Sequence, residues 1–126
     1  MRTAINTTYA AKPIGPYSQA ITAGNLLFVT AQYAEDPLTG KLITHTIEAE
    51  TKQVMENIKA ILAEAGIGFN NVVKCSIFLK NMQDYKAVNA VYGSYLASPF
   101  PARETIEVAG LPGNVNIEIS LIAVME

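Results

Sequence analysis

The sequence predicts an α+β fold in which a single mixed β-sheet carries two helices packed on one face. Two segments place apolar residues at helical spacing, and the other apolar runs are short or alternate as strands do. Their order is β-β-β-α-β-α-β-β, and each helix has one apolar stripe, so both stripes need the same sheet face. We expect residues 1–126 to form a single domain, because this length can bury its own core.

Residues from about 3 to 30 predict short strands separated by turn-forming residues. A turn over Pro13–Pro16 precedes a segment that starts at Tyr17, and a further strand covers Leu26–Thr30. Gly24-Asn25 lies between two apolar runs, which indicates a hairpin. The Pro and Gly of Asp36–Gly40 then reverse the chain.

The clearest helix runs from about Thr46 to Ala65, where apolar or small residues recur at steps of three and four. Thr46 is placed to cap its start, and Gly66 is placed to end it. The inward-facing positions are Ile47, Thr51, Val54, Ile58, Ile61, Leu62 and Ala65.

A strand over Val72–Lys80 follows, with alternating residues that predict one buried side. Cys75, the only cysteine, lies in the middle of this strand, so we interpret it as a core residue and not as a nucleophile. A second helix is predicted from about Met82 to Leu96, capped by Asn81.

Two strands close the chain, at about Arg103–Ala109 and Asn116–Met125. The turn formers of Gly110–Asn114 join them, so we predict an antiparallel hairpin. No third helix is available to cover the second sheet face. Charged residues make up only 16% of the chain, against roughly 25% in typical domains. We therefore expect other subunits to cover that face.

Charge and composition argue against several classes of function. The net charge of −2, the pI near 5.4 and the scattered lysines argue against nucleic acid as a partner. No apolar run reaches the 18 or more residues of a membrane span, and we expect a cytoplasmic protein without a membrane partner. The single histidine, His45, has no second ligand at metal-binding spacing, so no metal site is predicted.

Arg103 is the first candidate functional residue. It is one of only two arginines, and it enters its strand directly after the rigid corner at Phe100-Pro101. A guanidinium held in a defined direction can grip a planar carboxylate through two parallel hydrogen bonds. The alternative is a surface arginine that pairs with Glu104 or Glu107 of its own strand.

Glu118 is the second candidate, because it is a carboxylate in the middle of a largely apolar strand. A charge in such a place is unfavourable unless it is paired or solvated, so Glu118 is either the partner of a cation or a functional group. One register of the predicted hairpin would bring Arg103 near Glu118, although the sequence does not determine that register.

Four segments together resemble the RidA/YjgF family over essentially the whole chain. They are Gly15-Pro16-Tyr17-Ser18-Gln19-Ala20, Asn89 with Tyr92, Phe100-Pro101-Ala102-Arg103, and Ile117-Glu118-Ile119. The last two segments, with Glu118 fifteen residues after Arg103, are the most specific part of the match.

The resemblance implies a chorismate-mutase-like fold and a homotrimer with three clefts between neighbouring subunits. It also implies 2-iminobutanoate/2-iminopropanoate deaminase activity without a cofactor. Family members hydrolyse enamine and imine acids such as 2-aminoacrylate, which pyridoxal-phosphate-dependent dehydratases release, to 2-keto acids and ammonia.

The same resemblance implies residue roles. Arg103 would hold the substrate carboxylate, Glu118 would hold and polarise a water molecule, and Tyr17 would wall the cleft and offer its hydroxyl. Asn89 would be a supporting polar contact, with helix capping or surface exposure as its alternatives.

Two departures from the family pattern fall at expected substrate-binding positions: Thr30-Ala31 stands where many members have Ser-Gly, and Thr105 stands where many have cysteine. Outside these positions, Ser120 replaces a frequent acid.

Two other functions stay open at this point. A non-catalytic module that binds small carboxylates or keto acids needs only the arginine. An endoribonuclease that blocks translation is also attached to the family's name, but the chain lacks the basic and aromatic patches, histidine pair or metal ligands that RNA cleavage uses.

Overall fold

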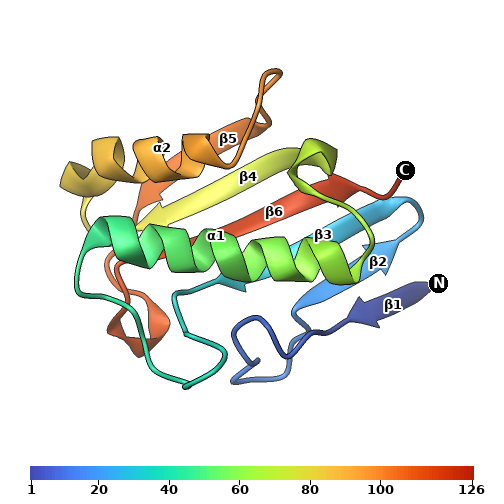
Figure 1. Cartoon of the computed structure of the whole chain (residues 1–126), viewed down its shortest axis with the longest axis horizontal. Coiled ribbons are helices and arrows are strands. Elements are labelled where there is room, and N and C mark those ends of the chain that lie inside the picture. The colour runs from blue at the N-terminus through green and yellow to red at the C-terminus, as the bar shows by residue number, and fades with distance from the viewer.

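The computed structural model describes residues 1–126 and contains one six-stranded sheet with two α-helices on one side of it (Figure 1). The strands are β1 (Arg2–Ile5), β2 (Ala20–Ala23), β3 (Leu26–Gln32), β4 (Val72–Leu79), β5 (Ala102–Glu107) and β6 (Ile117–Val124). The helices are α1 (Ile47–Glu64) and α2 (Tyr85–Ser94). The predicted α+β class and element order are confirmed.

The capping and turn residues act largely as the sequence predicts. The Thr46 hydroxyl accepts a hydrogen bond from the backbone N–H of Ala49 at 3.0 Å, which caps α1. Gly24, at the β2–β3 hairpin, and Gly66, after α1, have φ values of +60° and +78°, which favour glycine. The second helix begins later than predicted, because Met82–Asp84 forms a short 3₁₀ turn before α2.

The predicted hairpin between the last two strands is wrong. The sheet order is β1-β2-β3-β6-β4-β5, so β4 lies between β5 and β6. β4 pairs parallel to β5 and antiparallel to β6. Hydrophobicity explains this order, because β6 has one fully apolar face and is the more apolar of the two strands, which suits the centre of a sheet, whereas the charged β5 suits an edge.

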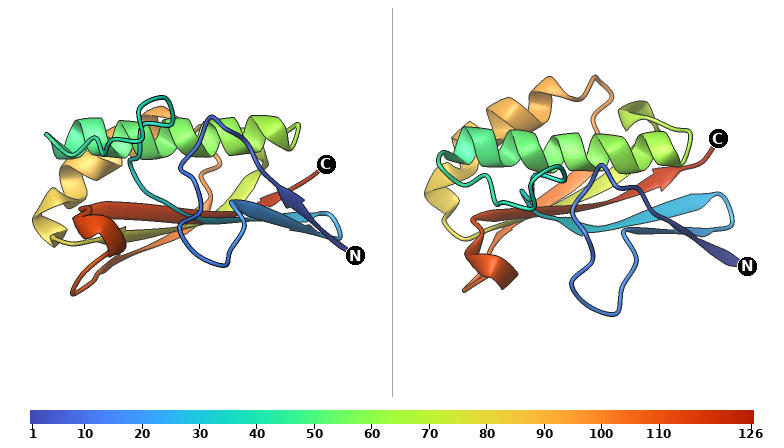
Figure 2. Two further views of the ribbon diagram at one scale, coloured as in Figure 1. Left: turned by 90° about the horizontal axis from the view of Figure 1, so that it is seen from below. Right: turned by 60° about the horizontal axis from the view of Figure 1, so that its bottom comes forward.

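Both helices lie on the same side of the sheet, α2 over β4 and β5 and α1 over β6 and β3 (Figures 1 and 2). The core fills the space between these layers and includes Ile58, Ile77 and Ile119, which are fully buried. The opposite face carries exposed apolar side chains, with Phe28 42% and Ile106 46% exposed. No helix in the structure is long and apolar enough to cross a membrane.

Glu50 ties α1 to the start of β6. Its side chain is fully buried, and its carboxylate accepts hydrogen bonds from the backbone N–H and the side-chain amide of Asn116, both at 2.7 Å. A buried carboxylate is unfavourable without such donors. The pair therefore holds the residue that leads into β6, two positions before Glu118.

We expect Glu50→Ala to lower the free energy of unfolding by about 3 kcal/mol or more, because two hydrogen bonds to a charged acceptor are lost. Glu50→Gln should lose less than half as much, since its amide accepts from the Asn116 backbone and can donate to a turned Asn116 side chain. Urea denaturation of both variants measures the difference. Equal losses would contradict the hydrogen-bonding role of this contact.

Candidate functional site

Arg103 lies near the start of β5 with its guanidinium against α2. Nη1 donates a hydrogen bond to Oδ1 of Asn89 at 2.6 Å, and Nη2 donates to the hydroxyl oxygen of Tyr85 at 2.9 Å. The guanidinium carbon also lies 5.5 Å from the ring centroid of Tyr85 and 5.1 Å from that of Tyr92. Two hydrogen bonds and two aromatic rings therefore define where the guanidinium points.

The alternative pairing of Arg103 with an acid of its own strand is not formed. Glu104 instead lies 3.3 Å from the Lys74 ammonium and accepts a hydrogen bond from the Ser76 hydroxyl. These contacts lower the pKa of Glu104, mainly through the Ser76 hydrogen bond. Glu107 accepts from the backbone N–H of Met82 at 2.7 Å. Both carboxylates are thus engaged elsewhere, and Arg103 keeps its charge unneutralised.

The helical repeat brings the three α2 residues to Arg103. Tyr85, Asn89 and Tyr92 are four and three positions apart, so they share one face of the helix. A cavity of about 280 Å³ opens beside them. Its lining consists of Asn89, Tyr92, Gly93, Phe100, Pro101 and Arg103. Asn89 is therefore a contact of Arg103, and the capping and surface alternatives are excluded.

Two hydroxyls near Arg103 are buried without a hydrogen-bond partner, those of Tyr92 and Thr105. Burial raises the pKa of Tyr92, the neighbouring Cys75 thiol raises it further, and the Arg103 charge opposes this. Burial likewise raises the pKa of Cys75, so the thiol is held neutral in the core. Thr105 lines neither this cavity nor the one around Glu118.

Glu118 lies in a second cavity, of about 200 Å³, at the other side of the molecule's sheet. The lining residues are Ile14, Tyr17, Thr30, Ala31, Tyr33, Pro112 and Glu118. Burial raises the pKa of Glu118 above its ordinary value. Burial, followed by the charge of Glu35, raises the pKa of Tyr33 to about 12, so this hydroxyl stays protonated near neutral pH.

Tyr17 is placed in this second cavity by the loop before β2. Its hydroxyl accepts a hydrogen bond from the backbone N–H of Ile14 at 3.2 Å, which keeps its own proton available as a donor. The next turn of the chain is anchored by Gln19, which is buried and donates to the carbonyl of Ala11 at 2.9 Å. The loop thus has a defined position beside Glu118.

The structure does not bring Arg103 and Glu118 together within one chain. In the strand registers, Arg103 lies opposite Cys75 and Glu118 lies opposite Phe78, with β4 between them. Cys75 faces the helices, whereas Phe78 faces the open side of the sheet. The hairpin register that would have joined the two residues is therefore wrong, and each lies on its own face.

Sequence reasoning grouped most of the candidate residues and missed two. Tyr17, Thr30 and Ala31 share the Glu118 cavity, and Asn89 contacts Arg103. The missed residues are Tyr33 and the hydroxyl of Tyr85. The four-residue spacing of Tyr85 and Asn89 shows that they share one face of a helix. It does not show which strand residue that face contacts.

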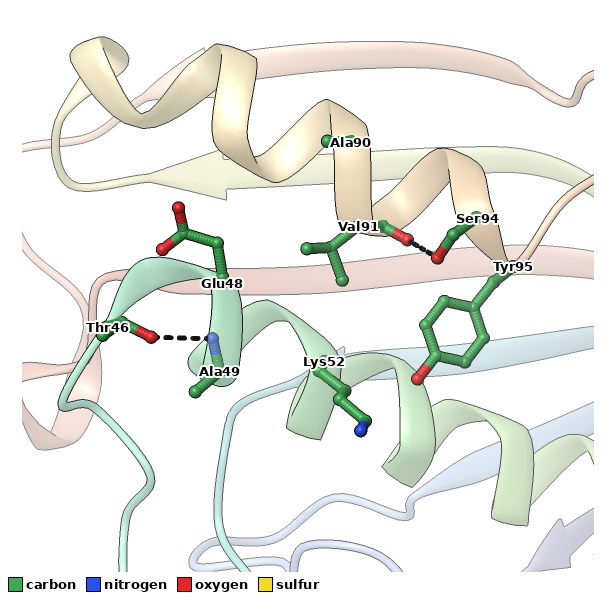
Figure 3. A pocket seen from close by; sticks show the side chains of 8 residues that line it. All are labelled: Thr46, Glu48, Ala49, Lys52, Ala90, Val91, Ser94 and Tyr95. Carbon is green, nitrogen blue, oxygen red and sulfur yellow. Dashed lines mark hydrogen bonds between the residues drawn. The ribbon is translucent and has the colours of Figure 1, made fainter.

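The largest cavity, about 620 Å³, lies elsewhere, in the groove between α1 and α2. Figure 3 shows Glu48 and Lys52 of α1 and Tyr95, which directly follows α2, around it. It uses the other side of α2 and contains none of the predicted residues. We assign the candidate site to the two smaller cavities, because they contain the unneutralised guanidinium and the half-buried carboxylate.

Comparisons with known proteins match nearly the whole chain. The family model described as Endoribonuclease L-PSP matches residues 7–125. A RutC family protein of Pyrococcus horikoshii is 49% identical over 126 residues, covering 100% of both chains. A 2-iminobutanoate/2-iminopropanoate deaminase of Dermatophagoides farinae is 41% identical over 122 residues, covering 97% of this chain and 95% of that protein.

A solved structure shows the same fold. The crystal structure of RidA from the Antarctic bacterium Psychrobacter sp. has a TM-score of 0.93 and 38% identity, and the match covers 97% of this chain and 98% of that one. The family match and the relatives extend over nearly the whole sequence, including both candidate cavities. The chain belongs to the RidA/YjgF family, which the matching model describes as Endoribonuclease L-PSP.

Proposed function

We propose that this protein hydrolyses small 2-imino and 2-enamino acids to 2-keto acids and ammonia. The observation that carries the proposal is the Arg103 guanidinium, which is oriented by neutral groups and has no acidic partner. A cation prepared in this way suits a carboxylate ligand. The relative of Dermatophagoides farinae, whose name states this activity, supports the same assignment.

The chemistry requires one water molecule and no change of oxidation state. Arg103 holds the substrate carboxylate, and Glu118 accepts a proton from a water molecule as its oxygen bonds to the imine carbon. The proton passes to the imine nitrogen, which gives a carbinolamine. The hydroxyl proton of the carbinolamine then moves to its nitrogen, the C–N bond breaks, and ammonia leaves as the carbonyl forms. The Tyr17 hydroxyl is positioned to donate to the substrate or the intermediate.

Little barrier lowering is needed. Imines of this kind hydrolyse in water, so the enzyme needs far less than the ~8–23 kcal/mol by which enzymes typically lower a barrier. Holding the carboxylate and the water molecule in a reactive orientation supplies most of the barrier lowering that this reaction needs. The proposal therefore uses no cofactor and no metal.

We call the surroundings of Arg103 and those of Glu118 the two half-sites. A complete site needs two copies of the chain, because these half-sites lie on different faces of one sheet. The exposed Phe28 and Ile106 on the open face support association through that face. The proposed assembly is a homotrimer in which Arg103 of one copy approaches Glu118 and Tyr17 of the next. Three equivalent clefts follow from the three-fold symmetry.

The description of the family as an endoribonuclease does not carry over to a site here. RNA binding favours basic stripes with aromatic platforms. Of the cations near the candidate cavities, Lys74 pairs with Glu104, and Arg103 is enclosed by α2. A small carboxylate fits this site better than a phosphate backbone does.

Arg103→Ala should lower kcat/KM for 2-aminocrotonate about 100-fold or more, because a bidentate charged contact is lost. A serine/threonine dehydratase generates the substrate in place, and keto-acid formation is compared with the uncatalysed rate. Arg2→Ala is the matched control, since Arg2 is the only other arginine and is exposed on β1. Wild type without acceleration, but with keto-acid binding, would instead indicate the non-catalytic carboxylate-binding module.

The rate should fall as the pH falls through the raised pKa of Glu118, because a protonated carboxyl group cannot take a proton from water. We expect this fall in rate to occur at a pH above the ordinary glutamate pKa of about 4.3. The measurement is kcat/KM against pH, with the uncatalysed rate subtracted at each pH. If Glu118→Gln shows the same fall in rate at low pH, Glu118 is not the group that accepts the proton.

The same raised pKa affects stability in the opposite direction: the rate rises with pH, whereas the stability of the folded chain falls. Burial favours protonated Glu118, so its ionisation destabilises the folded chain as the pH rises through that pKa. Glu118→Gln should thus be more stable than wild type near neutral pH and equally stable at low pH. This control separates loss of activity from loss of fold.

Mixing two inactive variants tests whether each site draws on two chains. Refolded together in equal amounts, Arg103→Ala and Glu118→Gln should regain about a quarter of wild-type activity, because random assembly pairs two intact halves in one cleft of four. Light scattering should give a mass three times the 13.6 kDa of one chain. A mixture that assembles to this mass and stays inactive would exclude the two-chain site.

A further inference from the structure

The Tyr85 hydroxyl holds an unused hydrogen-bond donor next to Arg103. Tyr85 is the first residue of α2 and is 40% exposed. Its oxygen accepts from Nη2 of Arg103 at 2.9 Å, which occupies a lone pair and leaves the O–H proton free. No group of the chain accepts that proton. An exposed, unpaired donor that contacts the guanidinium is well placed for the same anion.

The guanidinium itself has a limited number of donors for a ligand. Arginine carries five N–H groups, and the bonds to Asn89 and Tyr85 use two of them. The remaining three allow one bidentate fork, which needs two. A carboxylate has more acceptor positions than one fork fills, so a bound carboxylate can accept a further donor from beside the guanidinium.

Tyr92 shows why the assignment falls on Tyr85. Both rings contact the guanidinium, at 5.1 Å for Tyr92 and 5.5 Å for Tyr85. The Tyr92 hydroxyl, however, is buried beside Cys75, whereas that of Tyr85 lies at an exposed residue. Tyr92 therefore offers a bound anion no hydroxyl, and Tyr85 is the one tyrosine of α2 that offers its O–H at Arg103.

We propose that the Tyr85 hydroxyl donates a hydrogen bond to the ligand carboxylate that Arg103 grips, so that Tyr85 is a substrate-binding residue. This inference rests on the proposed function, because it takes a carboxylate as the ligand of Arg103. Tyr85 then has two roles at once. It accepts from Nη2 and so orients the guanidinium, and it donates to the bound carboxylate.

The test measures equilibrium binding of a product-like ligand, 2-oxobutanoate, by calorimetry with the assembled protein. Tyr85→Phe keeps the ring and removes only the hydroxyl, and it should weaken binding about tenfold, as expected for one hydrogen bond to a charged group. Tyr9→Phe is the matched control, because Tyr9 is 66% exposed and its hydroxyl has no hydrogen bond in the chain. In turnover, Tyr85→Phe should raise KM with a smaller effect on kcat.

A second variant separates donation to the ligand from orientation of Arg103. Replacing Tyr85 by 3-fluorotyrosine makes the hydroxyl a stronger donor and a weaker acceptor. At mildly acidic pH, where the phenol keeps its proton, the fluorinated protein should bind 2-oxobutanoate more tightly than wild type. If it binds more weakly, the hydroxyl only accepts from the guanidinium, and the proposal is overturned.

Arg103→Ala distinguishes failure of this inference from failure of the proposed function. If Arg103→Ala loses binding and Tyr85→Phe binds as wild type does, the proposal for Tyr85 is wrong and the Arg103 clamp stands. If Arg103→Ala binds as tightly as wild type, the carboxylate is held elsewhere, and both assignments fail. Weaker binding in Arg103→Ala and Tyr85→Phe, with tighter binding in the fluorinated protein, supports both.

Discussion

The position of β6 between β3 and β4 is the constraint on which the rest of the structure depends. A largely apolar strand buries the most apolar surface when it lies at the centre of a sheet, and β6 has one fully apolar face and two further apolar residues on the other. Once β6 is central, the unit β4–α2–β5 can add only outside it. The edge position of Arg103, the helix above it and the separation of Arg103 from Glu118 all follow from that placement.

The charge pattern around the edge strand is the second organising feature. Arg103 and Glu104 are adjacent in sequence but face opposite sides of β5, and only Glu104 finds an opposite charge, at Lys74. The partners of Arg103 are an amide oxygen, a phenol oxygen and two ring faces, none of which carries a formal charge. A cation that is well oriented but not neutralised retains its attraction for an incoming anion.

Local patterns in the sequence were sufficient for the type and order of the elements and for the ends of α1. The three- and four-residue spacing from Ile47 onward, with Thr46 and Gly66 at the ends, defined α1 closely. The family motifs likewise indicate Arg103, Glu118 and Tyr17 as candidate residues from the sequence alone. These signals are short-range, because a cap or a helical stripe is decided by neighbours in the chain.

Long-range pairing was not accessible in the same way. The turn formers of Gly110–Asn114 show that the chain reverses, but not that β6 passes β4 and pairs on its far side. The hydrogen bond between Tyr85 and Arg103 was likewise not predictable from local patterns, because it depends on how α2 lies across β5. Most residues of the candidate site could thus be named from sequence, whereas Tyr33, Tyr85 and the distribution of the site over two faces required the fold.

The separation of the two half-sites by β4 makes turnover a collective property under the proposed two-chain assignment. A solitary chain can be completely folded, with its guanidinium oriented and its carboxylate in place, and still lack a working cleft. Specific activity should then depend on concentration, because dilution below the dissociation constant of the assembly separates the halves without unfolding either. In a cell, the abundance of the protein would set its activity more steeply than in simple proportion.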